Sequence, residues 1–124
     1  MRKIDFRMYS SDKKGYFYDT RIVLECLINQ NMGHVDYVKE GYAFEQFTGL
    51  KDKNGVEIFE GDLLKSYDEH GNIDVDKVIY NTSHCKFMLV SDSESRLPIG
   101  LGEYSSFTLE VIGNIHEVNN ETTL

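Results

Sequence analysis

Apolar and polar residues alternate along much of this chain, which is typical of half-buried β-strands. The alternating segments cover residues 3–9, 35–47, 56–59, 73–80 and 107–118. The run CKFMLV at 85–90 follows the polar turn NTSH, so we expect it to pair back on 73–80 as an antiparallel strand. Strands at such short spacing predict a small barrel or a sandwich rather than a βαβ architecture.

The segment YFYDTRIVLECLINQN at 16–31 fits two structures. Four of its apolar residues share one helical face and predict a short helix near 21–29, with Thr20 as the N-cap candidate. These four residues are Ile22, Val23, Cys26 and Leu27. The β-branched and aromatic residues in its first half favour a strand instead. Both structures stay open at this stage.

Glycines mark the turns between the strands. SSDKKG closes a turn at Gly15, and Lys53-Asn54-Gly55 predicts a hairpin because Asn and Gly both tolerate the positive φ of primed turns. Glu60-Gly61-Asp62 predicts a second turn, in which Gly61 supplies positive φ. Gly113-Asn114 interrupts the last strand and predicts a β-bulge. Two reversals so close together are typical of the corners of small barrels.

These elements predict one domain over residues 1–118, in which N-terminal strands (1–46) precede a barrel core (47–118). A chain of 124 residues is long enough to bury a core without disulfides or metals. SDSESRLPIGLGE at 91–103 is polar and contains Gly and Pro, so we expect a mobile loop there. The polar residues 119–124 are expected to fray.

The charge of the chain is acidic, with 13 Lys and Arg against 21 Asp and Glu, or −8. Nucleic acids are bound through clustered cations that neutralise phosphates. The cationic cluster near the N-terminus is interrupted by Asp5 and Asp12. That cluster comprises Arg2, Lys3, Arg7, Lys13 and Lys14. We therefore expect no nucleic-acid partner, and the acidity indicates solubility.

Two cysteines, Cys26 and Cys85, lie in mostly apolar neighbourhoods and are expected to be buried free thiols of a cytosolic protein. The first residues, MRKIDFRMYS, lack the apolar core of a signal peptide. The longest apolar run, IVLECLI, is too short to span a bilayer and contains Glu25. We expect a cytosolic protein that does not bind membranes.

Glycines could also form a phosphate-binding loop, but such a loop needs consecutive backbone N–H groups at a helix N-terminus. Gly49, Gly55 and Gly61 are instead six residues apart between expected strands, so we interpret them as structural turn residues. The residues that we expect to matter structurally are Gly49, Asn54, Gly55, Gly61, Asp62 and Gly113.

Histidine and cysteine side chains show no spacing typical of a zinc site, which needs closely paired ligands. The histidines are His34, His70, His84 and His116. His84 and Cys85 are neighbours, so on a strand their side chains would point to opposite faces, which argues against a nucleophile pair. We expect no metal, cofactor or catalytic residue, and the roles of His84, Cys85 and His116 stay open.

Oxygen-bearing side chains at Asn72, Asp74 and Asp76 lack the turn, central Gly and distal Glu of a calcium loop, and predict a solvated strand face. The aromatic residues could form a stacking surface for single strands, but without a cationic groove they favour core packing or a protein interface. These residues are Tyr16, Phe17, Tyr18, Tyr37, Tyr42, Phe44 and Phe47.

Four stretches resemble the YopX family of bacteriophage and prophage proteins. They are IDFRMYSSDKKGYFY at 4–18, FTGLKDKNG at 47–55, EIFEGD at 57–62 and EVIGNI at 110–115. The resemblance implies a β-rich fold with an SH3-like barrel and a phage or prophage origin in a bacterial host. It implies no known reaction.

Together, these features favour a non-catalytic module that binds a protein partner or a second copy of itself. The alternative is an acidic regulator or inhibitor of a host nucleic-acid enzyme, whose surface imitates a phosphate backbone. An uncharted hydrolase is the third hypothesis.

We predict that the protein gives no mobility shift with single- or double-stranded DNA or RNA at low salt, where its excess of carboxylates acts over the longest range. A micromolar affinity that weakens steeply as salt rises would contradict this prediction.

Overall fold

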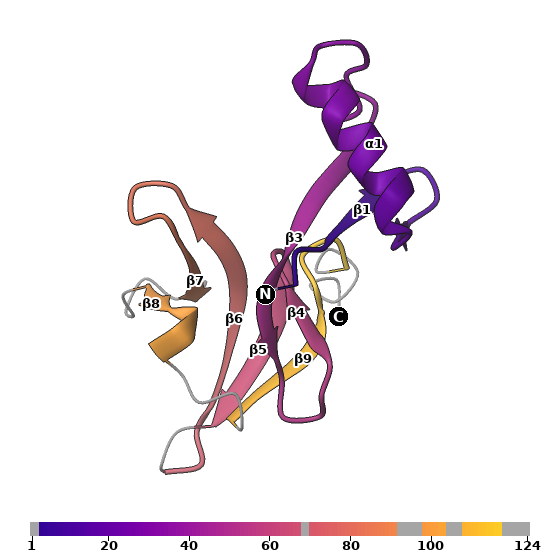
Figure 1. Ribbon diagram of the computed structural model, residues 1–124. Coiled ribbons are helices and arrows are strands. Elements are labelled where there is room, and N and C mark those ends of the chain that lie inside the picture. Colours follow the sequence, from indigo (N-terminus) through magenta and orange to yellow (C-terminus); the bar gives the residue numbers. More distant parts are fainter. Residues whose placement is uncertain (1–2, 68–69, 92–97, 104–107, 118–124) are drawn as a thin grey trace. The chain divides into compact units, whose positions relative to one another are not determined.

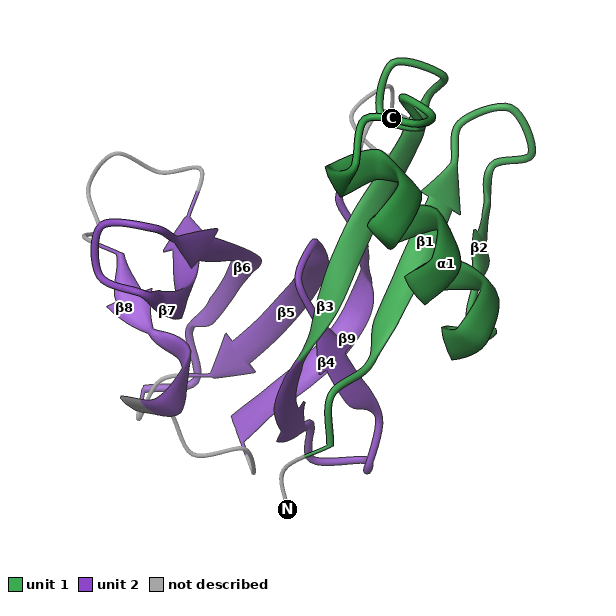
Figure 2. Cartoon of the chain, turned by 45° about the horizontal axis from the view of Figure 1, so that its top comes forward, with its two compact units in different colours: residues 1–47 green, residues 48–124 purple. Residues whose placement is uncertain are grey.

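The computed structural model describes residues 3–67, 70–91, 98–103 and 108–117. The chain divides into two compact units, residues 1–47 and 48–124 (Figure 2). Its described residues form nine β-strands, one α-helix and a short 3₁₀-helix (Figure 1). The predicted tail at 119–124 and residues 92–97 of the predicted loop lie outside the described residues.

The first unit contains an antiparallel sheet in which β1 is central. Its elements are β1 (Phe6–Ser10), β2 (Gly15–Phe17), α1 (Thr20–Asn31) and the first residues of β3 (Tyr42–Lys51). β1 pairs with β2 through Tyr9 and Tyr16, and with β3 through Met8 and Phe44. α1 packs beside β1. The prediction of additional N-terminal strands is confirmed.

Residues 20–31 are helical, which decides between the two structures that the sequence left open. The N-cap is Asp19, whose carboxylate accepts hydrogen bonds from the backbone N–H groups of Arg21 (3.1 Å) and Ile22 (3.4 Å). The prediction of Thr20 as N-cap is wrong by one residue. The Thr20 hydroxyl donates to the Asp5 carboxylate, which precedes β1. A carboxylate at the cap also suits the partial positive charge of a helix N-terminus.

The second unit is built on an antiparallel five-stranded sheet in the order β8-β7-β6-β5-β9. Its strands are β5 (Asp62–Tyr67), β6 (Ile73–Asn81), β7 (Lys86–Ser91), β8 (Ile99–Gly100) and β9 (Leu109–Asn114). The last residues of β3 pair with β4 (Glu57–Phe59). β6 bends strongly, and the sheet curls into a half-barrel (Figure 1). The predicted class, a β-rich chain with one short helix and a small barrel-like sheet, is confirmed.

The core of this unit is formed by residues from the curled sheet, from β4 and from the segment after β8. The core residues are Ile58, Leu64, Val78, Leu89, Leu101 and Leu109. Leu101 belongs to the segment predicted to be a mobile loop, but residues 99–103 form β8 and the 3₁₀-helix η1 (Leu101–Glu103). Burial of the Leu101 side chain explains why this part is ordered: its apolar surface is removed from water only in that arrangement.

The predicted pairing of 85–90 with 73–80 is confirmed, with Asn81 opposite Lys86 and Val78 opposite Leu89. The predicted solvated face of β6 is wrong at one position. Asp74 is exposed, but Asp76 is buried because it shares a face with the core residue Val78.

The predicted β-bulge in the last strand is confirmed. Leu63 pairs with Gly113 while the next residue, Leu64, pairs with Val111, so Ile112 is the extra residue. The bulge therefore lies one residue before the predicted Gly113-Asn114.

Gly61→Val should lower the free energy of unfolding by about 1–3 kcal/mol, because a β-branched residue is strained at positive φ. Gly61 has φ 87°, its N–H donates to the Val78 carbonyl, and its carbonyl accepts from the Ile115 N–H, both at 2.8 Å. Urea unfolding measures the change. The control Gly15→Val, at a residue of ordinary φ with an uncrowded Cβ position, should unfold like the parent; equal losses in both variants would contradict the prediction.

Candidate functional site

The glycines of the motif at 47–62 adopt backbone conformations with positive φ, which other residues rarely adopt. Gly49, Gly55 and Gly61 have φ values of 93°, 81° and 87°. Asn54 does not share this conformation, so the predicted primed turn is wrong. The turn is instead closed by the Gly55 N–H, which donates to the Asp52 carbonyl at 3.0 Å, and Gly55 alone supplies the positive φ.

The buried carboxylate of Asp52 organises this turn. Its Oδ1 accepts from the backbone N–H groups of Asn54 (2.8 Å) and Val56 (2.9 Å). Its Oδ2 accepts from the N–H of Val111 in β9 at 2.9 Å. Burial acts to raise the pKa of Asp52, but the three N–H donors and the nearby Lys53 outweigh it and hold the pKa below its ordinary value.

A second carboxylate, Asp62, is placed in the same way at the next turn. It is buried, and its Oδ2 accepts from the Phe59 N–H at 2.8 Å. Asp62 was among the residues expected to be structural, whereas Asp52 was missed. An Asp two residues before Asn-Gly is a signal for a side chain that caps its own turn, and it would have identified Asp52. Both carboxylates accept hydrogen bonds from backbone N–H groups of their own unit, so each stabilises a turn of the motif.

The two cysteines lie in environments that differ from those expected. His84 and Cys85 both lie in the turn between β6 and β7, so the strand expected over 85–90 begins one residue later, at Lys86. Cys85 has φ 53°. Cys85 is exposed and Cys26 is half-buried, so the expectation of two buried thiols is wrong. Across the described part of the chain, no three His, Cys, Asp or Glu residues are grouped so as to hold a metal ion.

A shallow pocket of about 320 Å³ opens in the second unit. Its lining comprises Thr48, Leu50, Lys86, Phe87, Gly100, Leu101 and Gly102. The Thr48 hydroxyl already donates to the Ile58 carbonyl at 2.7 Å. Lys86 is the charged residue of the lining, and no carboxylate, imidazole or thiol accompanies it there. This lining offers an apolar surface rather than a pair of acid–base groups.

The first unit buries an ion pair between neighbouring strands. Arg7 Nε lies 2.8 Å from Glu45 Oε1, and both side chains are buried. The Tyr16 hydroxyl donates to the same carboxylate oxygen at 2.9 Å, and the Arg7 guanidinium lies 4.1 Å from the centre of the Tyr16 ring. Arg7 was assigned to the cationic cluster near the N-terminus, and this buried network was not predicted. Opposite charges at paired positions can be recognised only once the register, here Arg7 opposite Glu45, is known.

The helix α1 exposes a stripe of apolar residues. Leu24, Ile28 and Met32 are 36%, 55% and 65% exposed. They are four residues apart and so lie on one helical face, with Met32 as the C-cap. Val23 is buried on another face of the same helix. Apolar residues thus occupy two faces of α1, although a helix at a protein surface needs only one.

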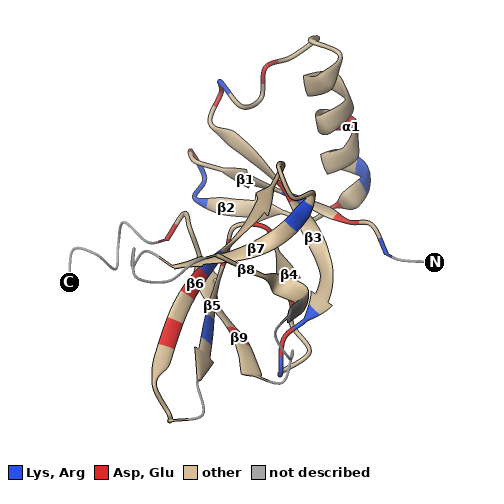
Figure 3. Cartoon of the chain, turned by 90° about the vertical axis from the view of Figure 1, so that its left-hand side faces the viewer, with Lys and Arg blue, Asp and Glu red and all other residues tan. Residues whose placement is uncertain are grey.

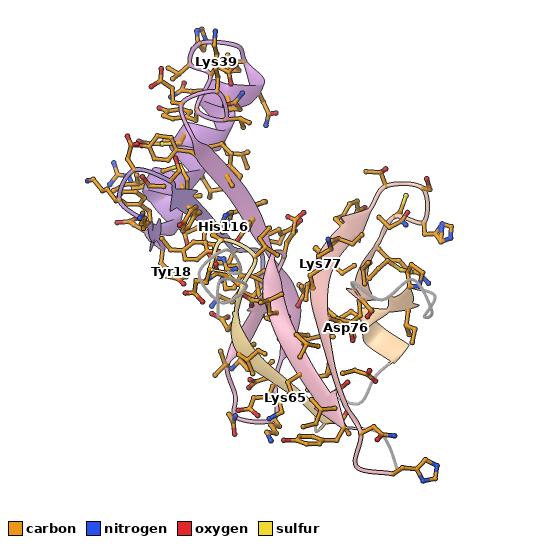
Figure 4. The ribbon with its side chains drawn as sticks, turned by 180° about the vertical axis from the view of Figure 1, so that it is seen from behind. Tyr18, Lys39, Lys65, Asp76, Lys77 and His116 are labelled. Carbon is orange, nitrogen blue, oxygen red and sulfur yellow. The ribbon has the colours of Figure 1, made fainter. Side chains whose placement is uncertain are left out.

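Some aromatic side chains of the first unit pack against one another, and others are exposed to solvent. Tyr37 meets Tyr42 and Phe44 edge-on, with ring centres 5.9 and 6.2 Å apart. Tyr18 is exposed beside Tyr16, 5.6 Å between ring centres (Figure 4). The aromatic side chains of this unit therefore pack mainly against one another and do not form one exposed platform.

No helix of the described residues is both long and apolar enough to cross a bilayer. The model of the YopX protein family matches residues 2–121, so the chain belongs to the YopX family, as its sequence motifs indicated. A comparison with curated proteins finds no significant match. The chain is similar to the crystal structure of protein EF1440 from Enterococcus faecalis, with a TM-score of 0.57 and 23% identity over 100% of both chains. At that identity the likeness concerns the fold alone.

Asp52→Asn should destabilise the protein at about pH 7 by about 1–3 kcal/mol, because the amide cannot accept at both ends and its NH₂ group would face an N–H donor. The folded-state pKa of Asp52 lies below the ordinary value of 3.8. Its stabilising contribution is therefore complete well above pH 3.8 and is lost as the pH falls below it. The difference in the free energy of unfolding between variant and parent, measured by urea unfolding, should become smaller toward about pH 3.

The control for this measurement is Asp12→Asn, at an exposed aspartate in the turn after β1. This variant should follow the parent at every pH. A stability gap for Asp52→Asn that is as large in acid as at neutrality would show that the ionised carboxylate is not what stabilises the turn.

Proposed function

We propose that this YopX-family protein is a non-catalytic binding module that associates with a second copy of itself through α1. The exposed stripe of Leu24, Ile28 and Met32 is the observation that carries the proposal. Exposed apolar residues that are contiguous on one face mark interaction surfaces, because burying them against a partner removes them from water.

The stripe is self-complementary. Leu24 and Met32 lie four residues to either side of Ile28, at equal distances along the helix. Two antiparallel copies of α1 related by a two-fold axis would therefore place Ile28 against Ile28 of the partner, and Leu24 against Met32 of the partner. A two-fold interface between identical copies pairs the same patch of both subunits in this way.

Charge favours the same surface. A net charge of −8 makes two copies repel each other over most approaches. The charged residues of α1 are Arg21 and Glu25, of opposite sign and 3.8 Å apart. The helix is thus electrically neutral, so two copies can meet there without bringing like charges together.

The interface would be small. A helix of 12 residues is about 18 Å long. Contacts of this size bury less than about 1,200 Å², which is the range of weak and transient complexes. We therefore expect a dimer that forms at tens of micromolar and above, in keeping with a regulatory or assembly role in a phage or prophage protein acting in the bacterial cytosol.

Sedimentation velocity over about 5–200 µM tests this proposal, because a weak dimer dissociates within that range. The parent should shift from monomer to dimer as concentration rises. Ile28→Lys should remain monomeric throughout, since two ammonium groups would meet on the axis.

The matched control is Ile22→Lys, which places the same charge at an exposed apolar residue on a different face of the same helix. This variant should dimerise like the parent. A parent that remains monomeric at 200 µM, or an Ile22→Lys variant as defective as Ile28→Lys, would overturn the proposal.

A further inference from the structure

One face of the β5–β6 pair in the second unit carries apolar and cationic side chains together. Tyr67, Ile73 and Val75 are exposed on it. Tyr67 pairs with Ile73, and Lys65 pairs with Val75. Because alternate strand residues share a face, these side chains lie opposite to the buried Leu64 and Ser66.

Three lysines from separate parts of the chain lie on or beside this face. Lys65 Nζ lies 5.2 Å from the centre of the Tyr67 ring, and Lys53 Nζ lies 5.8 Å from the centre of the same ring. Lys77 pairs with Leu63, two positions along from the Lys65–Val75 pair and on the same face. Figure 4 labels Lys65 on β5 and Lys77 on β6. We call Lys53, Lys65, Lys77, Tyr67, Ile73 and Val75 the lysine face.

These cations are only partly neutralised. Lys53 forms a salt bridge with Glu110 of β9 at 3.4 Å. Among the residues that the structure describes, no carboxylate forms a salt bridge with Lys77. The Tyr67 hydroxyl raises the pKa of Lys65, with a smaller contribution from Glu110, so Lys65 stays charged at neutral pH. Cationic and acidic residues are interleaved over the rest of the chain (Figure 3).

We propose that the lysine face binds an extended acidic polypeptide of another protein. Carboxylates of that segment would meet Lys65 and Lys77, while its apolar side chains would cover Tyr67, Ile73 and Val75. An apolar centre beside charged groups is the usual composition of a protein interface, and complementary charge selects the partner. This surface belongs to the second unit and does not depend on association through α1.

A single-stranded nucleic acid fits the same face less well. Its affinity would come from phosphate neutralisation, which three lysines supply weakly in a chain of charge −8. Stacking surfaces for single strands use successive aromatic rings along a cationic groove. Here one ring, Tyr67, is accompanied by the branched side chains of Ile73 and Val75, which suit apolar side chains better than bases.

The binding test uses a fluorescent random copolymer of glutamate and tyrosine, with polyglutamate and oligothymidine of similar length as reference probes. Fluorescence anisotropy is measured at about 50 mM and about 300 mM salt, which shortens the reach of the charges about twofold. The copolymer should bind at least about threefold more tightly than polyglutamate and weaken at the higher salt.

Substitutions test the contributions of the cationic and the apolar residues of the lysine face separately. The double variant Lys65→Gln/Lys77→Gln should weaken copolymer binding about five- to tenfold, and Lys77→Gln alone should weaken it about two- to threefold. Ile73→Ser should weaken the copolymer about threefold and leave polyglutamate unchanged. The matched control is Lys39→Gln, at an exposed lysine of the first unit, which should bind like the parent (Figure 4).

Several results would overturn the inference. Absence of copolymer binding at about 100 µM protein would do so, as would oligothymidine that binds as tightly as the copolymer. Equal weakening by Lys39→Gln would assign the effect to overall charge. Ile28→Lys, the variant that should abolish self-association, is expected to retain copolymer binding, so failure of the dimer and failure of the lysine face are distinguishable.

Discussion

The Asp52 carboxylate is the interaction on which the second unit most depends. Its two oxygens satisfy backbone N–H groups of the turn that precedes β4 and of Val111 in β9, which is 59 residues away in the sequence. A buried N–H group without an acceptor destabilises the folded state. Loss of this carboxylate would leave donors in two segments without an acceptor at once. The Lys53 N–H, which donates to the Leu109 carbonyl at 3.0 Å, joins the same two segments beside it. One short polar residue thereby fixes how the hairpin meets the last strand.

The first unit uses a buried ion pair for a related purpose. Arg7 and Glu45 are directly opposite each other in β1 and β3, and the Tyr16 hydroxyl bonds the same carboxylate from β2. Burial of two charges adds little net stability, because each ion loses its hydration. The ion pair does destabilise alternative strand registers, because a one-residue shift of β1 would leave Glu45 buried without its cation. We infer that the network specifies strand register in this unit more than it stabilises the folded state.

The sequence predicted most of the strands and the family, because period-two alternation is a local signal. The strand predicted over 35–47 is wrong at residues 35–41, since β3 begins at Tyr42, and Gly49, expected in a turn, lies within β3. The predictions were wrong where contacts between distant parts of the chain determine the local structure. Asp76 follows the strand pattern into the core despite its charge, and Leu101 orders a segment that looked like a loop. The helix cap moved from Thr20 to Asp19 because Asp5, distant in sequence, engages the Thr20 hydroxyl. Of the candidate surfaces, the aromatic residues were identified in advance, but the stripe of Leu24, Ile28 and Met32 on α1 was not.

The lysine face shows why a charge count along the chain is a poor guide to the field at its surface. Lys53, Lys65 and Lys77 follow one another at intervals of twelve residues, so the sequence does not show them as a cluster. Strand pairing places Lys77 diagonally from Lys65 on one face, and the turn after β3 brings Lys53 to the same tyrosine ring. The Glu110 carboxylate lies among them, opposite Lys65 and in a salt bridge with Lys53, and neutralises part of this charge. Within a Debye length of about 10 Å, the remaining local cations act more strongly than the distant carboxylates that make the chain acidic. A protein with a net negative charge can therefore present a locally cationic surface, and this is why we propose an acidic partner that also supplies apolar contact.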